Sequence, residues 1–475
     1  MITLATFTYM GTAMCQAQAL EEVLGYGLPV VVVNTVNGEE PTSETIMHPD
    51  GPYVGTTLTN IVPKEARMLI YRGDTIWYDS GYFANDKSGI KIRHRGNTSA
   101  VSSENKPFKL KLQKKANLID DTLEEEGGNV IDRASKDWLL LNYVTTVDLP
   151  VANWLSKLVG MEYTPRMEFV NVIINDDYRG MYVLSESISR EKECRIIVNK
   201  KDGYIIELDP YFWNEYFSIE SKLNKVMQWT FKFPDLEDIT EGQIDDIRSD
   251  IMRFEESISS QDYTKVIDVK SFAKWILVHD IMGTRDPAGC NIYIARTDRE
   301  PSSLMRMPVI WDMASSSMQV ANEWSRTHIE RGLFFYHLFA NEQCVEFAKA
   351  YIDEWERLKE ENAFDSLAAL IDGYASTPEG RGVKTSAPHH KQRWNYPYNG
   401  LVNLETILSV AKKWMNNRKQ WIEESLSEIE NILTPVSSVQ GGTKKHHAKE
   451  LLPDGRLIII GLEGQKYNAE GIRIE

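Results

Sequence analysis

The sequence predicts an α+β protein with two lobes, and three observations support this prediction. The first half of the chain is rich in short runs of β-branched or alternating apolar residues, such as Leu28–Asn34 and Lys106–Leu112. The second half contains longer segments in which apolar residues recur every three or four positions. Turn-forming residues, as in Asn175–Arg179, separate several of the early runs. Ligands favour the crevice between two such lobes.

Strands are expected through most of the first half. Leu28–Asn34 is a continuous apolar run and reads as a buried strand. In Lys106–Leu112 the apolar residues alternate with Lys109 and Lys111, which therefore share the opposite face. The other expected strands are Ala66–Tyr71, Thr75–Tyr78, Gly89–His94, Phe169–Ile174, Gly180–Leu184 and Gly203–Asp209.

Helices are expected mainly in the second half. Asp137–Gly160 also has a helical period, and Pro150 is expected to divide it into two helices. Pro378–Tyr398 is rich in Gly, Pro and basic residues and reads as a surface loop or a substrate-facing segment, with the surface loop favoured. The histidines His389 and His390 would then be exposed. The later helices are expected at Glu241–Ser257, Val269–Met282, Val345–Glu360 and Leu404–Glu430.

Composition narrows the classes of protein. The chain has 475 residues and a formal net charge of −16, which argues against broad binding to nucleic acid or to an anionic membrane. Of its four cysteines, Cys15 lies near the start, and the other three are too far apart for a disulfide framework or a CxxC metal site. Past the first residues, no apolar run reaches the length of a membrane span.

A possible phosphate cradle lies between two early strands. The strand Gly89–His94 leads into the loop Arg95–Ser99, and Lys109 and Lys111 lie on the strand that follows. Such a loop offers backbone N–H groups and hydroxyls, and a lysine offers a point charge for phosphates. The alternative interpretation is a solvated strand face with an ordinary hairpin loop.

Acidic residues follow a long apolar helix in the second half. The segment after Met282 contains Asp286 and then Asn291, which begins a short strand. A second apolar strand, Met307–Trp311, ends at Asp312. Protein kinases hold a base and their metal ligands with an Asp and an Asn on one loop and an Asp after a neighbouring strand. Asp and Asn also cap turns and helices, so the spacing leaves both interpretations open.

Several motifs together carry a family resemblance. They occur in one order along the chain: Arg95–Ser99, Lys106–Lys111, Tyr178–Glu186, Gly203–Asp209, Asp286–Asn291, Ile310–Asp312 and Ala411–Ile422. From about Leu28 to Leu433, the sequence that contains these motifs resembles the CotH family of spore-coat protein kinases.

The resemblance implies a two-lobed atypical protein-kinase-like fold. An antiparallel-sheet-rich N-lobe would span about 28–210 and a mainly helical C-lobe about 211–433. The implied activity is transfer of the ATP γ-phosphate to a Ser or Thr of a secreted or surface protein, with Mg²⁺ or Mn²⁺. By position, Asp286 would orient the acceptor hydroxyl, while Asn291 and Asp312 would bind the metal.

The nucleotide would be held by residues of the first half. On the same resemblance, Lys109 or Lys111 would bind the phosphates, with Arg95 and Ser99 on the loop above. Glu207 would lie near the adenine.

This sequence departs from the family pattern at two places. Ala288 stands where the family loop usually carries a His, and Met313-Ala314 follow Asp312 where a second acid is usual. A catalytically degenerate protein that binds nucleotide without transferring phosphate is therefore an alternative. A structural surface or coat component that reuses the fold is another.

The two ends of the chain suggest export. Residues 1–19 are apolar and small and end in an A-x-A-like site, which predicts a signal peptide or leader; Cys15 could instead carry a lipid. Residues 434–450 have linker composition. Residues 451–475 predict a short β segment that resembles the C-terminal segments of exported proteins from Bacteroides-like bacteria, which act in sorting or anchoring. A periplasmic, cell-surface or extracellular location is expected.

Overall fold

The structure is a computed structural model of the chain, which divides into two compact units, residues 1–433 and 434–475. The expected leader with Cys15, and also Asp286 and Ala288, lie outside the described residues. The structure describes residues 20–50, 55–119, 125–126, 129–130, 132–191, 194–223, 227–258, 260–285, 291–314, 317–325, 334–340, 344–433, 448–451, 457–460 and 466–467.

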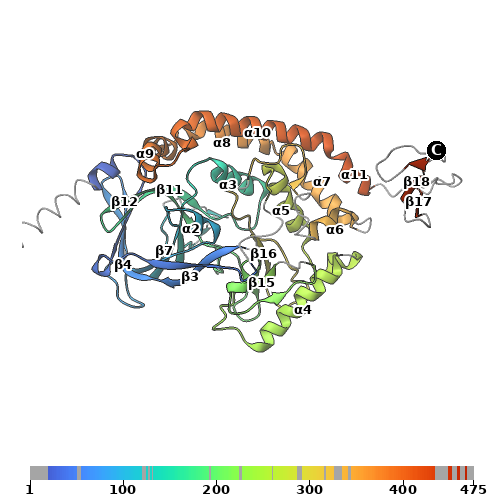
Figure 1. Ribbon diagram of the computed structural model, residues 1–475, viewed down its shortest axis with the longest axis horizontal. Coiled ribbons are helices and arrows are strands. Elements are labelled where there is room, and N and C mark those ends of the chain that lie inside the picture. The colour runs from blue at the N-terminus through green and yellow to red at the C-terminus, as the bar shows by residue number, and fades with distance from the viewer. Residues whose placement is uncertain are drawn as a thin grey trace, which may run out of the picture. The chain divides into compact units, whose positions relative to one another are not determined.

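A closed barrel of seven strands forms the N-terminal part of the first unit (Figure 1). Its strand order is β1-β11-β12-β10-β7-β6-β4, and an antiparallel pairing of β1 with β4 closes the ring. The strand β5 (Thr75–Asp79) forms a hairpin with β4 outside the ring. The barrel strands are β1 (Val30–Thr35), β4 (Lys64–Arg72), β6 (Ile90–His94), β7 (Phe108–Ala116), β10 (Ser135–Leu141), β11 (Met167–Ile174) and β12 (Asp177–Glu186).

This barrel corrects the expected fold. The α+β class holds, but a closed barrel followed by helices is not the typical two-lobed kinase-like fold, so that expectation is wrong. The decisive strand is β1, which pairs in parallel with β11 along one edge and antiparallel with β4 along the other. Its first four valines are buried, as the continuous apolar run predicts. Such a run signals burial on both faces and carries no information about which strands lie beside it.

A second sheet of four strands lies beside the barrel. Its order is β14-β15-β13-β16, and all its pairings are antiparallel. A two-stranded ribbon, β2 (Thr42–Met47) and β3 (Thr56–Val62), packs on the short helix α2 (Thr98–Ser102). The sheet strands are β13 (Tyr204–Asp209), β14 (Ile219–Glu220), β15 (Gln228–Phe233) and β16 (Ile292–Arg296), and smaller pieces are η1 (Val36–Gly38), β8 (Glu125–Glu126), β9 (Asn129–Val130) and η3 (Phe212–Asn214).

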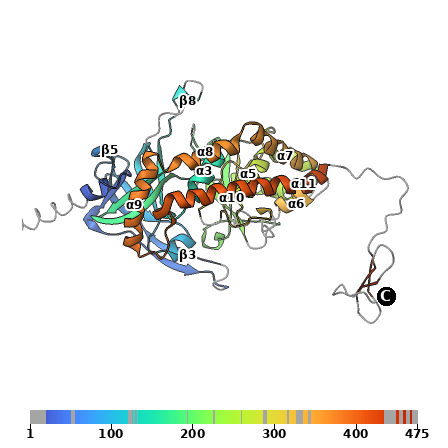
Figure 2. The same ribbon diagram turned by 90° about the horizontal axis from the view of Figure 1, so that it is seen from above.

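Helices make up the rest of the first unit. The helix α5 (Val269–Met282) is buried at their centre and contacts α3, α7 and α10, while α8 and α10 run side by side (Figures 1 and 2). The others are α3 (Asp148–Val159), α4 (Glu241–Ser257), η4 (Gln261–Lys265), α6 (Phe334–Ala340), α7 (Val345–Glu360), α8 (Ala363–Tyr374), α9 (Pro378–Trp394), η6 (Gly400–Asn403), α10 (Leu404–Ser425) and α11 (Ser427–Leu433). The second unit contains β17 (Ala448–Leu451), β18 (Leu457–Ile460) and β19 (Lys466–Tyr467) in one antiparallel sheet. Among the described residues, no helix combines the length and apolar character needed to cross a lipid bilayer.

Two expected elements differ in the structure. The segment expected as two helices, Asp137–Gly160, begins as part of β10 and becomes the helix α3. Pro150 lies in the first turn of α3, where a missing N–H costs no hydrogen bond. Pro378–Tyr398, expected as a loop, is mostly the helix α9; Thr377 caps it by accepting the N–H of Gly380, and Pro378 occupies its first turn.

Candidate functional site

A large cleft collects most of the residues that the sequence singles out. Its volume is about 1390 Å³, and its walls come from the barrel, the ribbon, α3, the four-stranded sheet and the segment 310–314. Arg95, Ser99, Lys109, Glu207, Asn291 and Asp312 all line it, whereas Lys111 does not. The other charged lining residues are Asp50, Arg93, Asp209, Glu215, Lys232 and Arg285.

Asn291 and Asp312 lie next to each other in this cleft. The Nδ2 group of Asn291 donates a hydrogen bond to Oδ2 of Asp312 at 3.5 Å. Both residues have left-handed backbone, with φ of 63° and 58°. Asn and Asp tolerate this region best among residues with a side chain, and such conformations concentrate at functional sites. The two expected metal ligands are therefore adjacent, on the two segments that the sequence predicts.

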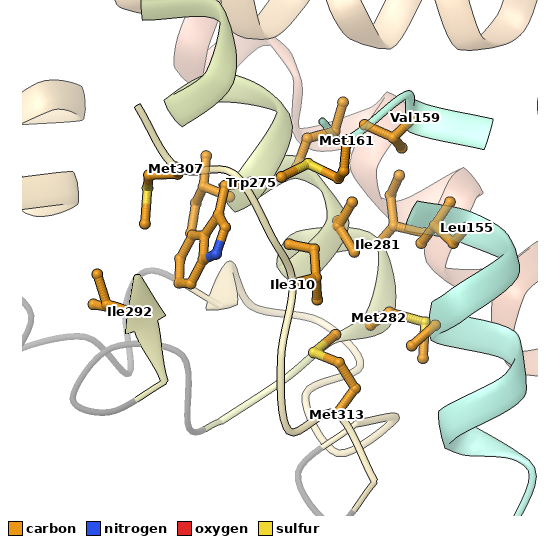
Figure 3. Close-up of a cluster of buried hydrophobic side chains, with 14 of the residues drawn as sticks. Leu155, Val159, Met161, Trp275, Ile281, Met282, Ile292, Met307, Ile310 and Met313 are labelled. Carbon is orange, nitrogen blue, oxygen red and sulfur yellow. The ribbon is translucent and has the colours of Figure 1, made fainter. Parts of the chain in front are cut away.

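Apolar contacts fix the segment that carries Asp312. Ile310 and Met313, on either side of it, are buried next to Ile281 and Met282 of α5 (Figure 3). The indole Nε1 of Trp275 donates to the carbonyl of Val309 at 3.1 Å. The expected strand Met307–Trp311 is not a regular strand here; in the described part of the chain it pairs through an isolated bridge between Val309 and Tyr163. Packing, more than sheet pairing, positions Asp312.

A cationic wall formed by barrel strands is part of the same cleft. Lys109 on β7 lies opposite Arg93 on β6 in the antiparallel register. The Nζ atoms of Lys109 and Lys111 are 3.1 and 2.7 Å from the carboxylate oxygens of Asp137 on β10. Burial opposes ionisation of Asp137, but the two lysines outweigh it and lower its pKa. Lys109 lines the cleft, whereas Lys111, which pairs with the same carboxylate, does not.

Arg93 and Arg95 add two guanidinium groups to this wall. Both are half-buried, and among the described residues neither side chain has a hydrogen-bonded or ion-paired partner. Burial, followed by repulsion from Arg95, lowers the pKa of Arg93. Guanidinium groups that are partly withdrawn from water gain most from an anion that accepts two parallel hydrogen bonds, such as phosphate or carboxylate. The wall is thus prepared for an anionic ligand.

The loop after β6 depends on a glycine. Gly96 has φ of 93°, and a Cβ there would lie 2.7 Å from Oγ of Ser99. The loop therefore turns tightly between Arg95 and the start of α2, and it holds Ser99 on the cleft. Asn97 also accepts a hydrogen bond from Thr57 of the ribbon, which joins the loop to β3.

Glu207 lies in a charged cluster on the four-stranded sheet. Nζ of Lys232 is 2.6 Å from Oε2 of Glu207. Burial and the nearby Glu207 raise the pKa of Asp209 to about 6. Burial opposes the charge of Lys232, but Glu207 and Asp209 outweigh it and raise its pKa. Apolar lining, which suits a flat base, lies instead at Leu139, Leu141, Leu149, Met167 and Ile310.

The oxygen donors suit a hard divalent cation. Mg²⁺ is usually held in proteins by one or two carboxylates together with water and substrate phosphates. Asp312 supplies a carboxylate, and the side-chain amide of Asn291 carries a carbonyl oxygen beside it. Within the described ranges there is no group of three or more His, Cys, Asp or Glu that could hold a metal on its own. The site therefore suits a metal that is shared with a phosphate ligand.

Arg93, Asp209 and Lys232 are among the lining residues that were not anticipated from the sequence. Arg93 could have been found, because its cross-strand position opposite Lys109 follows once the strands at 89–94 and 106–112 are paired. Asp209 and Lys232 could not have been found in this way, because no local sequence pattern indicates that β13 pairs with β15. Asp286 is outside the described residues, although Arg285, just before it, lines the cleft.

The adjacent oxygen donors of Asn291 and Asp312 and the cationic wall thus line one cleft. A family model described as CotH kinase protein matches residues 92–422. The chain therefore belongs to the CotH kinase family, and the match includes Arg93, Lys109, Asn291 and Asp312. A search of curated proteins found no match.

Proposed function

We propose that this kinase-like protein transfers the γ-phosphate of ATP to a Ser or Thr hydroxyl of a protein acceptor, with Mg²⁺ or Mn²⁺. The observation that carries the proposal is the Asn291–Asp312 pair, which lines the same cleft as Arg93, Arg95 and Lys109. Phosphoryl transfer depends on positioning and charge neutralisation, and it needs little covalent help from the protein. This set of residues supplies both.

Each wall would have a separate task. Asn291 and Asp312 would hold the metal, which neutralises phosphate charge when bound. Arg93, Arg95 and Lys109 would bind the phosphate oxygens, and Ser99 could donate its hydroxyl. The apolar lining residues Leu139, Leu141, Leu149 and Met167 would accept the base. Asp286 would orient the acceptor hydroxyl, as the family motif implies.

A second candidate is a degenerate kinase that binds nucleotide without transfer. Met313 and Ala314 follow Asp312 where the family pattern has one residue and then a second acid, and both are buried in the hydrophobic core. Only Asp312 in this short segment therefore presents a carboxylate to the cleft. A site with one carboxylate would bind the metal more weakly than a site with two.

Export is part of the proposal. The leader-like residues 1–19 and the C-terminal β segment support it, and the acceptor would then be a secreted or surface protein. The sheet of β17, β18 and β19 is a small separate unit, as a sorting or anchoring segment would be.

The direct test is transfer of labelled phosphate from ATP by the full chain, with Mg²⁺ or Mn²⁺ and a generic protein acceptor. Asp312→Ala should reduce transfer by more than about 100-fold, since a catalytic metal contributes several kcal/mol and each 1.4 kcal/mol is tenfold in rate. Asp286→Asn should abolish transfer and spare nucleotide binding. The matched control is Asp353→Ala on the exposed face of α7, which should transfer normally.

The outcomes separate the candidates. Label on the acceptor with the wild type but not with Asp312→Ala supports the kinase. A metal-dependent thermal shift with ATP but no label supports the degenerate form. The absence of both label and thermal shift would contradict the active and the degenerate kinase and favour a structural surface protein. Full activity of Asp312→Ala would overturn the assignment of Asp312 to the site.

A further inference from the structure

The chain segments next to the two proposed metal ligands, Asn291 and Asp312, are joined to each other by backbone hydrogen bonds. The helix α5 ends at Met282 and leads toward Asn291, and the segment 317–325 follows shortly after Asp312. The N–H of Met318 donates to the carbonyl of Met282 at 2.6 Å. The N–H groups of Gln319 and Val320 both donate to the carbonyl of Gly283 at 3.0 Å. Backbone bonds thus dock the later segment on the end of α5.

One side chain spans this junction from a distant part of the sequence. Arg418 on α10 is 1% exposed. Its Nε donates to the carbonyl of Asp280 in α5 at 2.6 Å. Its two terminal nitrogens donate to the carbonyls of Ala321 and Glu323 at 2.8 and 2.6 Å. A single planar guanidinium therefore bonds to both segments at once.

The carboxylate of Asp280 completes the junction from the other side. Its Oδ1 accepts the N–H of Ser325 at 2.7 Å, and its Oδ2 accepts the hydroxyl of Tyr351 at 3.1 Å. Ser325 also donates its hydroxyl to the carbonyl of His279 at 2.8 Å. Asp280 is fully buried. Burying a guanidinium and a carboxylate is costly, and such a network is worth more for fixing geometry than for stability.

We propose that Arg418 is a positioning residue for the metal site. It lines no part of the cleft, and it acts by fixing the segment after Asp312 against the end of α5, which leads to Asn291. The guanidinium of Arg418 then contributes to the relative placement of the two proposed metal ligands, together with the backbone bonds and Asp280. Residues outside the metal's own ligands commonly tune metal affinity or activity by about 10- to 100-fold. This inference rests on the proposed function of the cleft.

The test is Arg418→Lys in the full chain. Lysine keeps the charge but has a compact ammonium that cannot donate in three fixed directions. The half-saturating Mn²⁺ concentration in the ATP-dependent thermal shift should rise about 10-fold. In the transfer assay kcat should fall by about 10-fold, whereas KM for the acceptor should stay within about twofold.

The matched control is Arg357→Lys on α7. Arg357 also donates to a backbone carbonyl, that of Val159 at 2.9 Å, and to Glu354, but it touches neither of the two joined segments. A merely structural role would lower the melting temperature of both variants and leave the Mn²⁺ dependence of the folded protein unchanged.

The results distinguish this inference from the proposed function. A rise in half-saturating Mn²⁺ in Arg418→Lys alone supports the positioning role. If the wild type binds ATP and transfers phosphate, but Arg418→Lys and Arg357→Lys show the same Mn²⁺ dependence, the positioning role is overturned. The proposed kinase function would still stand in that case. A wild type that shows neither binding nor transfer would overturn the two together.

Discussion

Arg93 offers a way to separate anion binding from metal binding at the level of one residue. Arg93→Gln removes a half-buried guanidinium that lines the cleft beside Arg95. A hydrogen bond to a charged group is worth about 1.5–3 kcal/mol, so the Kd for ATP should rise by at least about 10-fold. The melting temperature without ligand should not fall, because repulsion between the two arginines is relieved.

The control for this change is Lys111→Gln on the neighbouring strand. Lys111 is outside the cleft and pairs with Asp137, so its loss should leave ATP binding within about twofold. Calorimetric titration of ATP in the presence of Mn²⁺ measures both. Equal losses of affinity would show that the wall acts through general charge and not through contact.

Residue patterns anticipated that Asn291 and Asp312 would lie close together, and their role as metal ligands stays a prediction. Asn291 and Asp312 could be anticipated because each directly adjoins a short apolar run, and such runs are brought together by the core. Lys232 could not be ranked above other cations, since its importance comes from burial and from its ion pair with Glu207. Arg93 becomes apparent only once the expected strands at 89–94 and 106–112 are paired. Glu207 lines the cleft, but its partners are charged, and its predicted place near the adenine stays a prediction.

At the scale of elements, the end of α5 is the most constrained point near the site. Gly283 has φ of 56°, and a Cβ there would lie 2.6 Å from both the ring of Trp414 and the carbonyl of Val320. Gly283→Ala should lower the free energy of unfolding by about 3 kcal/mol, from left-handed strain plus overpacking. Urea denaturation measures this value.

A glycine within a helix provides the comparison. A Cβ added at Gly373 in α8 would meet no other atom within 4 Å, so Gly373→Ala should stabilise the protein by about 0.5–1 kcal/mol. Stabilisation by both alanines would show that the end of α5 is free to rearrange.

The sequence predicted helices correctly where apolar residues recur over a long and uninterrupted stretch. The expected bounds of α4, α5 and α7 agree with the structure. α4 and α7 each have a sustained apolar stripe, and α5 is a long apolar run that is buried on nearly every side. The prediction was wrong for Pro378–Tyr398 because composition rich in Gly and Pro outweighed a good N-cap at Thr377. As a result His390, expected to be exposed, is fully buried, and its Nδ1 accepts the N–H of Met181 at 3.0 Å.

Two buried histidines affect the stability of the whole molecule. Burial lowers the pKa of His279 to about 3 and that of His390 to about 4. The unfolded chain binds these protons near pH 6.5, so protonation favours unfolding. Each histidine therefore removes stability as the pH falls below about 6.5, and the loss from His390 ends near its folded pKa.

The variant His390→Gln isolates one of these contributions. Between pH 6.5 and pH 5 the wild type should lose about 1.6 kcal/mol more unfolding free energy than the variant, because the slope approaches 1.36 kcal/mol per pH unit only below the unfolded pKa. Urea denaturation at several pH values gives the two slopes. Parallel slopes would mean that His390 is protonated in the folded protein.

For the whole molecule, the α+β fold class was easier to predict than the arrangement of the strands. Burial of Val30–Val33 is visible in the sequence, but closure of the barrel depends on which strands lie beside them. That choice is made by strands far apart in the chain, and local patterns do not encode it.

The parallel pairing of β1 with β11 has a consequence for the chain as it is synthesised. The valines of β1 emerge first, yet their partners on β11 lie at residues 171–174. Until that stretch has left the ribosome, one edge of a strand with four consecutive valines has no neighbour, and such an edge invites pairing with another chain. A chaperone that holds the first 170 or so residues would therefore raise the yield of monomer, and a slow pause in translation before β11 would lower it.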